Sequence, residues 1–145
     1  MEEKKVQFNI QRIFIKDLSF ESPMVPEAFN DLSSSPQIGF NFESNINDLG
    51  NDVFELTLTF NVKAEVENKI LYMVELKQSG VFSIMIDDEA LKKRFINVHC
   101  AEIVYPYARE TISSVIQKGG FPPLFLSPID FHTIYQNEID KRNNN

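Results

Sequence analysis

Two histidines and one cysteine are the residues of this chain that are most able to do chemistry. His99 stands directly before Cys100, and His132 lies in a later segment. Such residues can hold a metal ion or form a nucleophile–base pair. Their spacing fits neither a closed zinc site nor a local catalytic signature, and the sequence has no Gly-x-Ser-x-Gly elbow. We therefore expect no metal, no cofactor, no catalytic residue and no enzyme activity.

Two other motifs invite a chemical interpretation. Asp87, Asp88 and Glu89 could bind a cation, but acids at the start of a helix more often complement its dipole. Gly119 and Gly120 are followed by Phe-Pro-Pro rather than by Lys-Ser/Thr, so they predict a helix stop and not a phosphate loop.

Composition excludes several classes of protein. With 14 basic and 21 acidic residues the net charge is −7, which argues against binding to nucleic acid or to an anionic membrane. No apolar stretch is long enough to span a bilayer, and residues 1–7 have no apolar export signal. Because there is only one cysteine, no disulfide can form within the chain. We expect a cytoplasmic protein with no direct membrane insertion.

Hydrophobic patterning predicts four strands followed by helices, an α+β layout. Residues 53–66 alternate apolar and polar side chains over an unusually long run, and residues 6–11, 38–43 and 70–84 can pair with it. A change of phase near Arg12 predicts a bulge or a twist. Residues 70–74 are all apolar, so we expect helices on one face of that strand and another subunit on the other.

Residues 21–35 contain two prolines and three consecutive serines, which predicts an irregular crossover loop between the first two strands. Helices are expected after Asp87, from Tyr105 to Lys118 with Pro106 in the first turn, and again after Asp130. We expect one domain over residues 1–140, with its helices on one face of the sheet, and a disordered tail over residues 141–145.

Apolar side chains in the crossover loop and around Leu124 and Leu126 exceed what one core needs to absorb. They can simply cover the sheet, or they can form a groove. Because Phe and Met adapt to many partners, such a groove would suit an extended, unfolded chain.

Four blocks of the chain resemble the SecB family of protein-export chaperones. They are FNIQRIFIKDLSFESP (residues 8–23), GVFSI (80–84), YPYARE (105–110) and GFPPLFLSPIDF (120–131). The resemblance implies a four-stranded antiparallel sheet backed by helices and assembled as a homotetramer, a dimer of dimers. It also implies an ATP-independent holdase that keeps unfolded secretory precursors competent for translocation and delivers them to the SecA motor ATPase.

The same resemblance assigns three sets of residues. The client-binding groove would comprise Met24, Val25, Phe29, Ile38, Phe40, Phe42, Leu124, Leu126, Phe131, Ile134 and Tyr135. Docking of the motor ATPase would use Asp17, Glu21, Met73 and Glu75, and the tetramer interface would use Val74, Leu76 and Gln78.

Three alternatives remain at this point. A related chaperone could protect one dedicated antitoxin partner instead of many precursors. The chain could also be an oligomeric structural protein with a dry Phe core, or an enzyme that uses the space under the crossover loop; the lack of a convergent catalytic set argues against the last.

Overall fold

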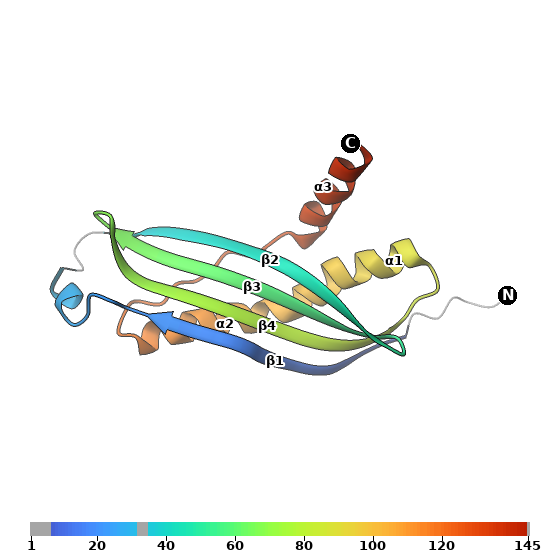
Figure 1. Ribbon diagram of the computed structural model, residues 1–145, viewed down its shortest axis with the longest axis horizontal. Coiled ribbons are helices and arrows are strands. Elements are labelled where there is room, and N and C mark those ends of the chain that lie inside the picture. The colour runs from blue at the N-terminus through green and yellow to red at the C-terminus, as the bar shows by residue number, and fades with distance from the viewer. Residues whose placement is uncertain (1–6, 32–34, 145) are drawn as a thin grey trace.

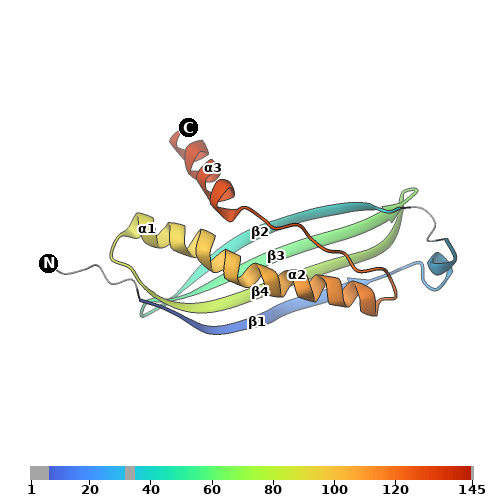
Figure 2. The same ribbon diagram turned by 180° about the vertical axis from the view of Figure 1, so that it is seen from behind.

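Four long antiparallel strands form one sheet, and a helical layer covers only one of its faces (Figures 1 and 2). The computed structural model describes residues 7–31 and 35–144, so Val6, Ser33, Ser34 and Asn145 lie outside the described residues. In spatial order the strands are β1 (Gln7–Glu21), β4 (Lys69–Met85), β3 (Val53–Val66) and β2 (Gln37–Gly50). The predicted α+β class and the antiparallel sheet are confirmed.

Two tight turns make β2, β3 and β4 a continuous meander. Asn51 and Asp52 connect β2 to β3, and Glu67 and Asn68 connect β3 to β4. All four have positive φ angles, between 51° and 64°. This backbone matches the natural twist of paired strands and is tolerated best by Asn, Asp and Gly. The long strand predicted at residues 53–66 is confirmed with the same bounds.

Strand β1 contains two bulges where its pairing with β4 shifts. One lies between Ile10 and Arg12 and confirms the predicted change of phase; the other lies between Ile15 and Asp17. Each extra residue reverses the alternation of side chains between the two faces of the sheet. As a result, Ile10, Ile15 and Leu18 all lie on the helix-covered face, opposite Phe82, Gln78 and Leu76 of β4.

A nearly continuous helical run lies across the covered face (Figure 2). It consists of α1 (Glu89–Arg94), a π-helical segment (Phe95–Cys100) and α2 (Ala101–Lys118). Asp88 begins it by accepting hydrogen bonds from the amides of Ala90 and Leu91.

The expectation of a separate helix beginning near Tyr105 is wrong, because Pro106 lies inside α2. The proline leaves one backbone carbonyl of the preceding turn without its usual donor. Pro106 and Glu102 are both exposed, so water can reach that part of the helix. Packing of Ile96, Cys100 and Val104 against the sheet holds the run together on its opposite side.

The predicted stop at Gly119 and Gly120 is confirmed. Gly119 is the C-cap of α2, and Gly120 has a φ of +91°, which glycine adopts without strain. The core lies between α2 and the sheet, and its largest fully buried side chains include Phe60, Phe82 and Leu56.

Two chain segments can be compared with their expectations. In the apolar run at residues 70–74, Tyr72 and Val74 face the helices, and Leu71 lies at a register shift beside the crossover loop. Met73 lies half-buried on the open face, where a second subunit stays a prediction. The last helix, α3 (Phe131–Asn143), includes Lys141 and Arg142, which were expected in the tail. These two cations lie in the final turn, where the negative end of the helix dipole attracts them and the attraction stabilises the helix.

Among the described residues, no helix is long and apolar enough to cross a membrane.

Candidate functional site

Aromatic side chains gather where β2 meets the root of α3. The rings of Phe40 and Phe42 lie 5.9 and 5.8 Å from the ring of Phe60, which is fully buried in β3. Phe131, the first residue of α3, packs edge-on against Phe42 at 5.9 Å and against Tyr105 at 5.8 Å. We call these five residues the β2 aromatic cluster. It passes from the core at Phe60 to the surface at Phe40, which is 39% exposed.

The position of α3 leaves a hollow beside this cluster. Asp130 caps the helix by accepting hydrogen bonds from the amide and the hydroxyl of Thr133, at 3.1 and 2.7 Å. These bonds to the charged form lower the pKa of the Asp130 carboxyl. The hollow has a volume of about 340 Å³, and its lining comes from β2, the π-helical segment and α3: Phe42, Glu43, Ser44, Asn97, Phe131, Ile134, Tyr135 and Glu138.

The crossover loop forms a second apolar site, built on aromatic contacts at the other end of α2. Phe29 lies 5.2 Å from Phe121, and Phe121 lies 5.1 Å from Tyr72. A smaller hollow of about 200 Å³ beneath the loop is lined by Met24, Glu27, Ala28, Val66, Glu67, Lys69 and Leu71. Val25 packs against the core, whereas Phe29 remains 39% exposed.

The linker over residues 121–130 joins these two places as it runs from α2 back to α3 (Figure 2). The hydroxyl of Tyr105 donates a hydrogen bond to the carbonyl of Ser127 and fixes the linker on α2. Leu124 and Leu126 pack against the core with their side chains half-buried. Phe125 points outward and is 78% exposed. The linker therefore lays apolar side chains along the path between the two hollows.

The structure thus divides the eleven predicted groove residues into two groups joined by the linker. Five lie around the hollow beside α3 or on the adjoining aromatic cluster: Phe40, Phe42, Phe131, Ile134 and Tyr135. Three lie in the crossover loop, namely Met24, Val25 and Phe29. Ile38 of β2 is 39% exposed. It pairs with Ala64 of β3, and Ala64 pairs with Tyr72 of β4, so these three residues form a row across the sheet that leads towards the crossover loop.

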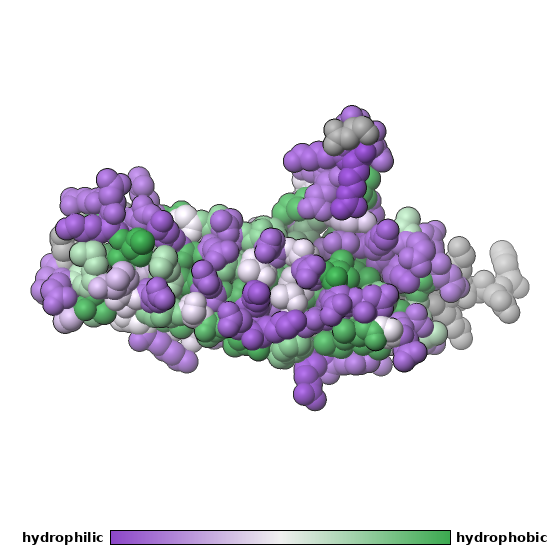
Figure 3. All heavy atoms as spheres, viewed as in Figure 1, coloured by the Kyte–Doolittle hydropathy of each residue, from purple (hydrophilic) through white to green (hydrophobic). Residues whose placement is uncertain are grey.

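The four predicted docking residues all lie on the open face of the sheet. Glu21 pairs with Met73 across β1 and β4, while the next two pairs along the same strands are Ser19 with Glu75 and Asp17 with Lys77. Glu21, Glu75 and Asp17 are exposed, and Met73 is half-buried. Figure 3 shows hydrophilic side chains spread along this face with hydrophobic ones between them.

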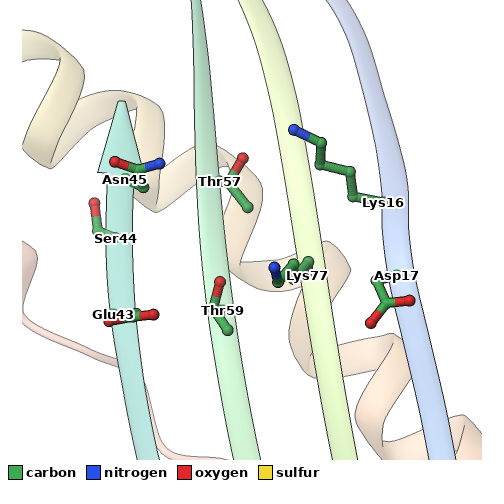
Figure 4. A pocket seen from close by; sticks show the side chains of 8 residues that line it. All are labelled: Lys16, Asp17, Glu43, Ser44, Asn45, Thr57, Thr59 and Lys77. Carbon is green, nitrogen blue, oxygen red and sulfur yellow. The ribbon is translucent and has the colours of Figure 1, made fainter. Parts of the chain in front are cut away.

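Two shallow hollows follow this open face. One, of about 540 Å³, is lined by polar and charged residues from all four strands, including Asp17, Glu43, Thr59 and Lys77, which lie side by side across the sheet (Figure 4). The other, of about 470 Å³, is lined in part by Met73 and Glu75. The face therefore presents a polar surface with the half-buried thioether of Met73 near its acids.

The three predicted interface residues lie on the opposite, helix-covered face. Val74, Leu76 and Gln78 are at most 3% exposed, so the chain's own helices and strands cover them. Gln78 Oε1 has no hydrogen-bond partner within the part of the chain that the structure describes. The strand residue opposite Gln78 is Ile15, which is 47% exposed on the edge of the sheet.

Comparison with known proteins now identifies the family. The model of the family described as "SecB: Preprotein translocase subunit SecB" matches residues 1–142. The chain belongs to the SecB family. A protein-export protein SecB from Methylococcus capsulatus is 38% identical over 133 residues, 92% of this chain and 85% of the relative. Another, from Cellvibrio japonicus, is 40% identical over 135 residues, 93% of this chain and 80% of the relative.

A solved structure supports the fold. The SecB-like chaperone of Mycobacterium tuberculosis, in complex with a peptide from an antitoxin, aligns with a TM-score of 0.69 at 14% identity. The alignment covers 84% of this chain and 90% of that one. The SecB family assignment makes the chain a protein-export chaperone, for which the implied role is non-enzymatic.

The residues first considered for chemistry have other roles in this SecB fold. Cys100 is fully buried, and burial raises the pKa of its thiol to about 12, so it is a poor nucleophile in the folded chain. His99 packs against the rings of Phe8 and Phe95. His132 lies in α3, 3.2 Å from the guanidinium of Arg94.

Sequence reasoning missed Arg94, which the structure places in contact with α3. Its guanidinium donates a hydrogen bond of 2.8 Å to the Oε1 atom of Gln136 and lies 5.3 Å from the ring centre of Tyr135. In the sequence it is the last of three consecutive cations, Lys92, Lys93 and Arg94, a pattern typical of a helix C-terminus. Nothing in that pattern indicates which of the three contacts another helix.

Proposed function

We propose that this SecB-family chaperone holds unfolded secretory precursors along the apolar surface formed by the crossover loop, β2, the linker and α3. The observation that carries the proposal is the β2 aromatic cluster, whose rings continue from the core at Phe60 to Phe40 at the surface. Exposed apolar patches next to hollows mark binding surfaces. Ile38, Ile134 and Phe125 add exposed apolar area on the adjoining elements.

The energetics favour many weak contacts over one strong site. Each large apolar side chain that is buried against a client contributes about 1.5–3 kcal/mol before the ordering of an extended peptide is subtracted. Two hollows joined by the linker offer separate places for such side chains on each chain. Several chains in one assembly would add avidity, so a long unfolded client would bind more tightly than a short peptide. No nucleotide is required.

We further propose that the open face docks the SecA motor ATPase through Asp17, Glu21, Met73 and Glu75. The pairing of Glu21 with Met73 and of Asp17 with Lys77 puts these side chains on one exposed surface. Exposed acids attract a basic partner quickly and release it at moderate salt. Clients and the motor would then occupy different surfaces, as a hand-over requires.

The proposed assembly is a homotetramer, a dimer of dimers, in the cytoplasm. Support comes from the edge strand β1, where Ile10, Ile15 and Leu18 are 39–47% exposed on the helix-covered face. A second copy that packs here would bury them. Val74, Leu76 and Gln78 are covered by this chain's own helices and strands, so they would act indirectly, by supporting α2 and β1.

One experiment tests the function as a whole. The protein is sized in solution and then added, without nucleotide, to a slow-folding precursor whose refolding is followed by fluorescence. A tetramer that retards refolding supports the proposal. If the protein sizes as a monomer and the precursor refolds at its usual rate, the proposal fails.

A further inference from the structure

Arg94 makes three contacts with one helix. The guanidinium of this α1 residue lies 3.2 Å from His132 Nδ1, donates to Gln136 Oε1 at 2.8 Å and stacks 5.3 Å from the centre of the Tyr135 ring. Because arginine only donates hydrogen bonds, a hydrogen bond between these two groups requires His132 Nδ1 to accept. An extended planar donor of this kind can hold several groups in one geometry.

Besides Arg94, two features of the described residues fasten α3: its first turn, and its contacts with the π-helical segment. Phe131 anchors its first turn in the β2 aromatic cluster. The hydrogen bonds that Thr133 donates to Asp130 and that Gln136 donates to Asp140 are internal to the cap and the helix. Beyond that turn, the helix projects away from the sheet (Figures 1 and 2). The direction of α3 therefore depends on its hydrophobic first turn, on the π-helical segment beside it and on Arg94.

The residues that Arg94 holds adjoin the lining of the hollow beside α3. His132, Tyr135 and Gln136 follow one another at helical spacing and form one stripe, while Phe131, Ile134 and Glu138 form the neighbouring stripe that lines the hollow. Tyr135 belongs to both stripes, since it contacts Arg94 and also lines the hollow. The guanidinium thus contacts the side of α3 next to the one that lines the hollow, and so fixes this wall of the hollow.

We propose that Arg94 is a positioning residue that sets the distance between α3 and β2 and so selects the size of the client side chain that the hollow accepts. This inference rests on the proposed client-binding function. Phe42, Glu43 and Ser44 form the fixed wall on β2, and α3 forms the adjustable one. Without Arg94, α3 pivots about Phe131 and the hollow loses its defined width. The difference in affinity between clients with large and with small side chains then becomes smaller.

The test uses the full chain and two extended peptides that are identical except for a central Phe or a central Ala. Titration gives the ratio of the two affinities, and amide hydrogen exchange of residues 134–143 reports how firmly α3 is held. The variants are Arg94→Ala and Arg94→Lys, with Lys93→Ala as the matched control, because Lys93 is an exposed cation on the same turn. Arg94→Lys keeps the charge but not the forked donor.

In Arg94→Ala we expect exchange in α3 to rise at least fivefold and the Phe-to-Ala affinity ratio to fall about fivefold, with the sheet amides unchanged. Arg94→Lys should show part of both effects and Lys93→Ala neither. Gln136→Ala removes one of the contacts without altering α1. It should also raise exchange in α3 and lower the affinity ratio, so it tests the proposal even if Arg94→Ala does not fold.

The two ideas fail in different ways. If the unmodified chain binds neither peptide, the proposed function is wrong, and the exchange data still decide whether Arg94 holds α3. If the unmodified chain favours the Phe peptide but Arg94→Ala leaves the affinity ratio or the exchange of α3 unchanged, the positioning role of Arg94 is wrong and the client-binding function stands.

Discussion

Lys16 and Glu55 form an ion pair that crosses an intervening strand. The ammonium of Lys16 in β1 lies 3.1 Å from one carboxylate oxygen of Glu55 in β3 and 3.2 Å from the other, although β4 separates the two strands. Lys16 stands at the second bulge of β1, which releases its side chain from the regular alternation. The pair links β1 to β3 across β4 on the open face. On the same face, Thr57 of β3 and Ser79 of β4 form a buried hydroxyl contact.

Removal of Lys16 should therefore destabilise the fold more than an ordinary surface charge does. Lys16→Met leaves the Glu55 carboxylate, which is 9% exposed, without its cation, and we expect a loss of about 1–3 kcal/mol in the free energy of unfolding. Lys63→Met is the control, because its partner Glu65 is 34% exposed and such pairs contribute about 0–1 kcal/mol. Urea unfolding of both variants measures the difference; equal losses would contradict the structural role of the pair.

Reversal of one charge on the open face should separate docking from client holding. Glu75→Lys, or Asp17→Lys, is expected to weaken binding to SecA about tenfold, a change of about 1.4 kcal/mol, while refolding of a precursor stays retarded. Glu110→Lys in α2 is the matched control, since Glu110 is exposed but belongs to the opposite layer. A common loss of both activities in Glu75→Lys would refute the assignment of separate surfaces.

Phe40 offers the most selective test of the client surface. Phe40→Ser should lower client affinity about fivefold to twentyfold with little loss of stability, because the side chain is already 39% exposed. Phe40→Ser with Phe42→Ser should weaken it further, with some loss of stability because Phe42 packs on Phe60 and Phe131. Leu49→Ser is a control on the same strand at 50% exposure. If client affinity is unchanged in both Phe variants, these rings belong to the hydrophobic core and not to a client-binding surface.

The close approach of α2 and β1 predicts an intolerant glycine. A Cβ atom at Gly119 would lie 2.2 Å from the ring of Phe20, so Gly119→Ala should destabilise the chain by about 1–3 kcal/mol. At Gly39 the nearest atom would be 3.8 Å away, and Gly39→Ala should be tolerated. Thermal unfolding compares the two; a stable Gly119→Ala would mean that Phe20 can move aside without loss.

The cap of α3 predicts a response to acid. The folded pKa of Asp130 is lowered, so its contribution to stability is present above the unfolded pKa of about 4 and is lost as the pH falls through the lower folded value. Exchange of the α3 amides should therefore rise below about pH 4, whereas Asp130→Ala should show the raised exchange already at pH 7. If α3 responds equally to acid with and without Asp130, the cap is not the cause.

Much of the sheet could be predicted from the sequence, since period-two alternation identified residues 53–66 without error. Periodicity failed at the second bulge of β1, because Ile13, Ile15 and Leu18 are spaced unevenly and only the pairing with β4 explains their common face. It also failed at Pro106, where tertiary packing overrides a local preference.

The candidate site, too, could be predicted from the sequence only in part. Of the residues carried over from the family resemblance, the docking set lies on the open face, the groove set beside the helical layer, and the interface set in the buried core. No hydrophobic pattern could have separated them in this way. Arg94 could not be found in this way, since its importance comes from contacts with His132 and Gln136, residues far along the chain. Such pairings are set by the folded geometry and leave no local signal in the sequence.

The order of the strands has a consequence for biosynthesis. β1 is made first, yet among the described strands it pairs with β4 alone, and Gln7 pairs with Met85. At roughly 5–20 residues per second, the ribosome takes about 4–16 s to add the intervening chain. During that interval the nascent β1, with Ile10, Ile15 and Leu18, has no strand to pair with. Each newly made copy of this chaperone is thus briefly an unfolded polypeptide with an apolar segment of the kind that other nascent proteins expose.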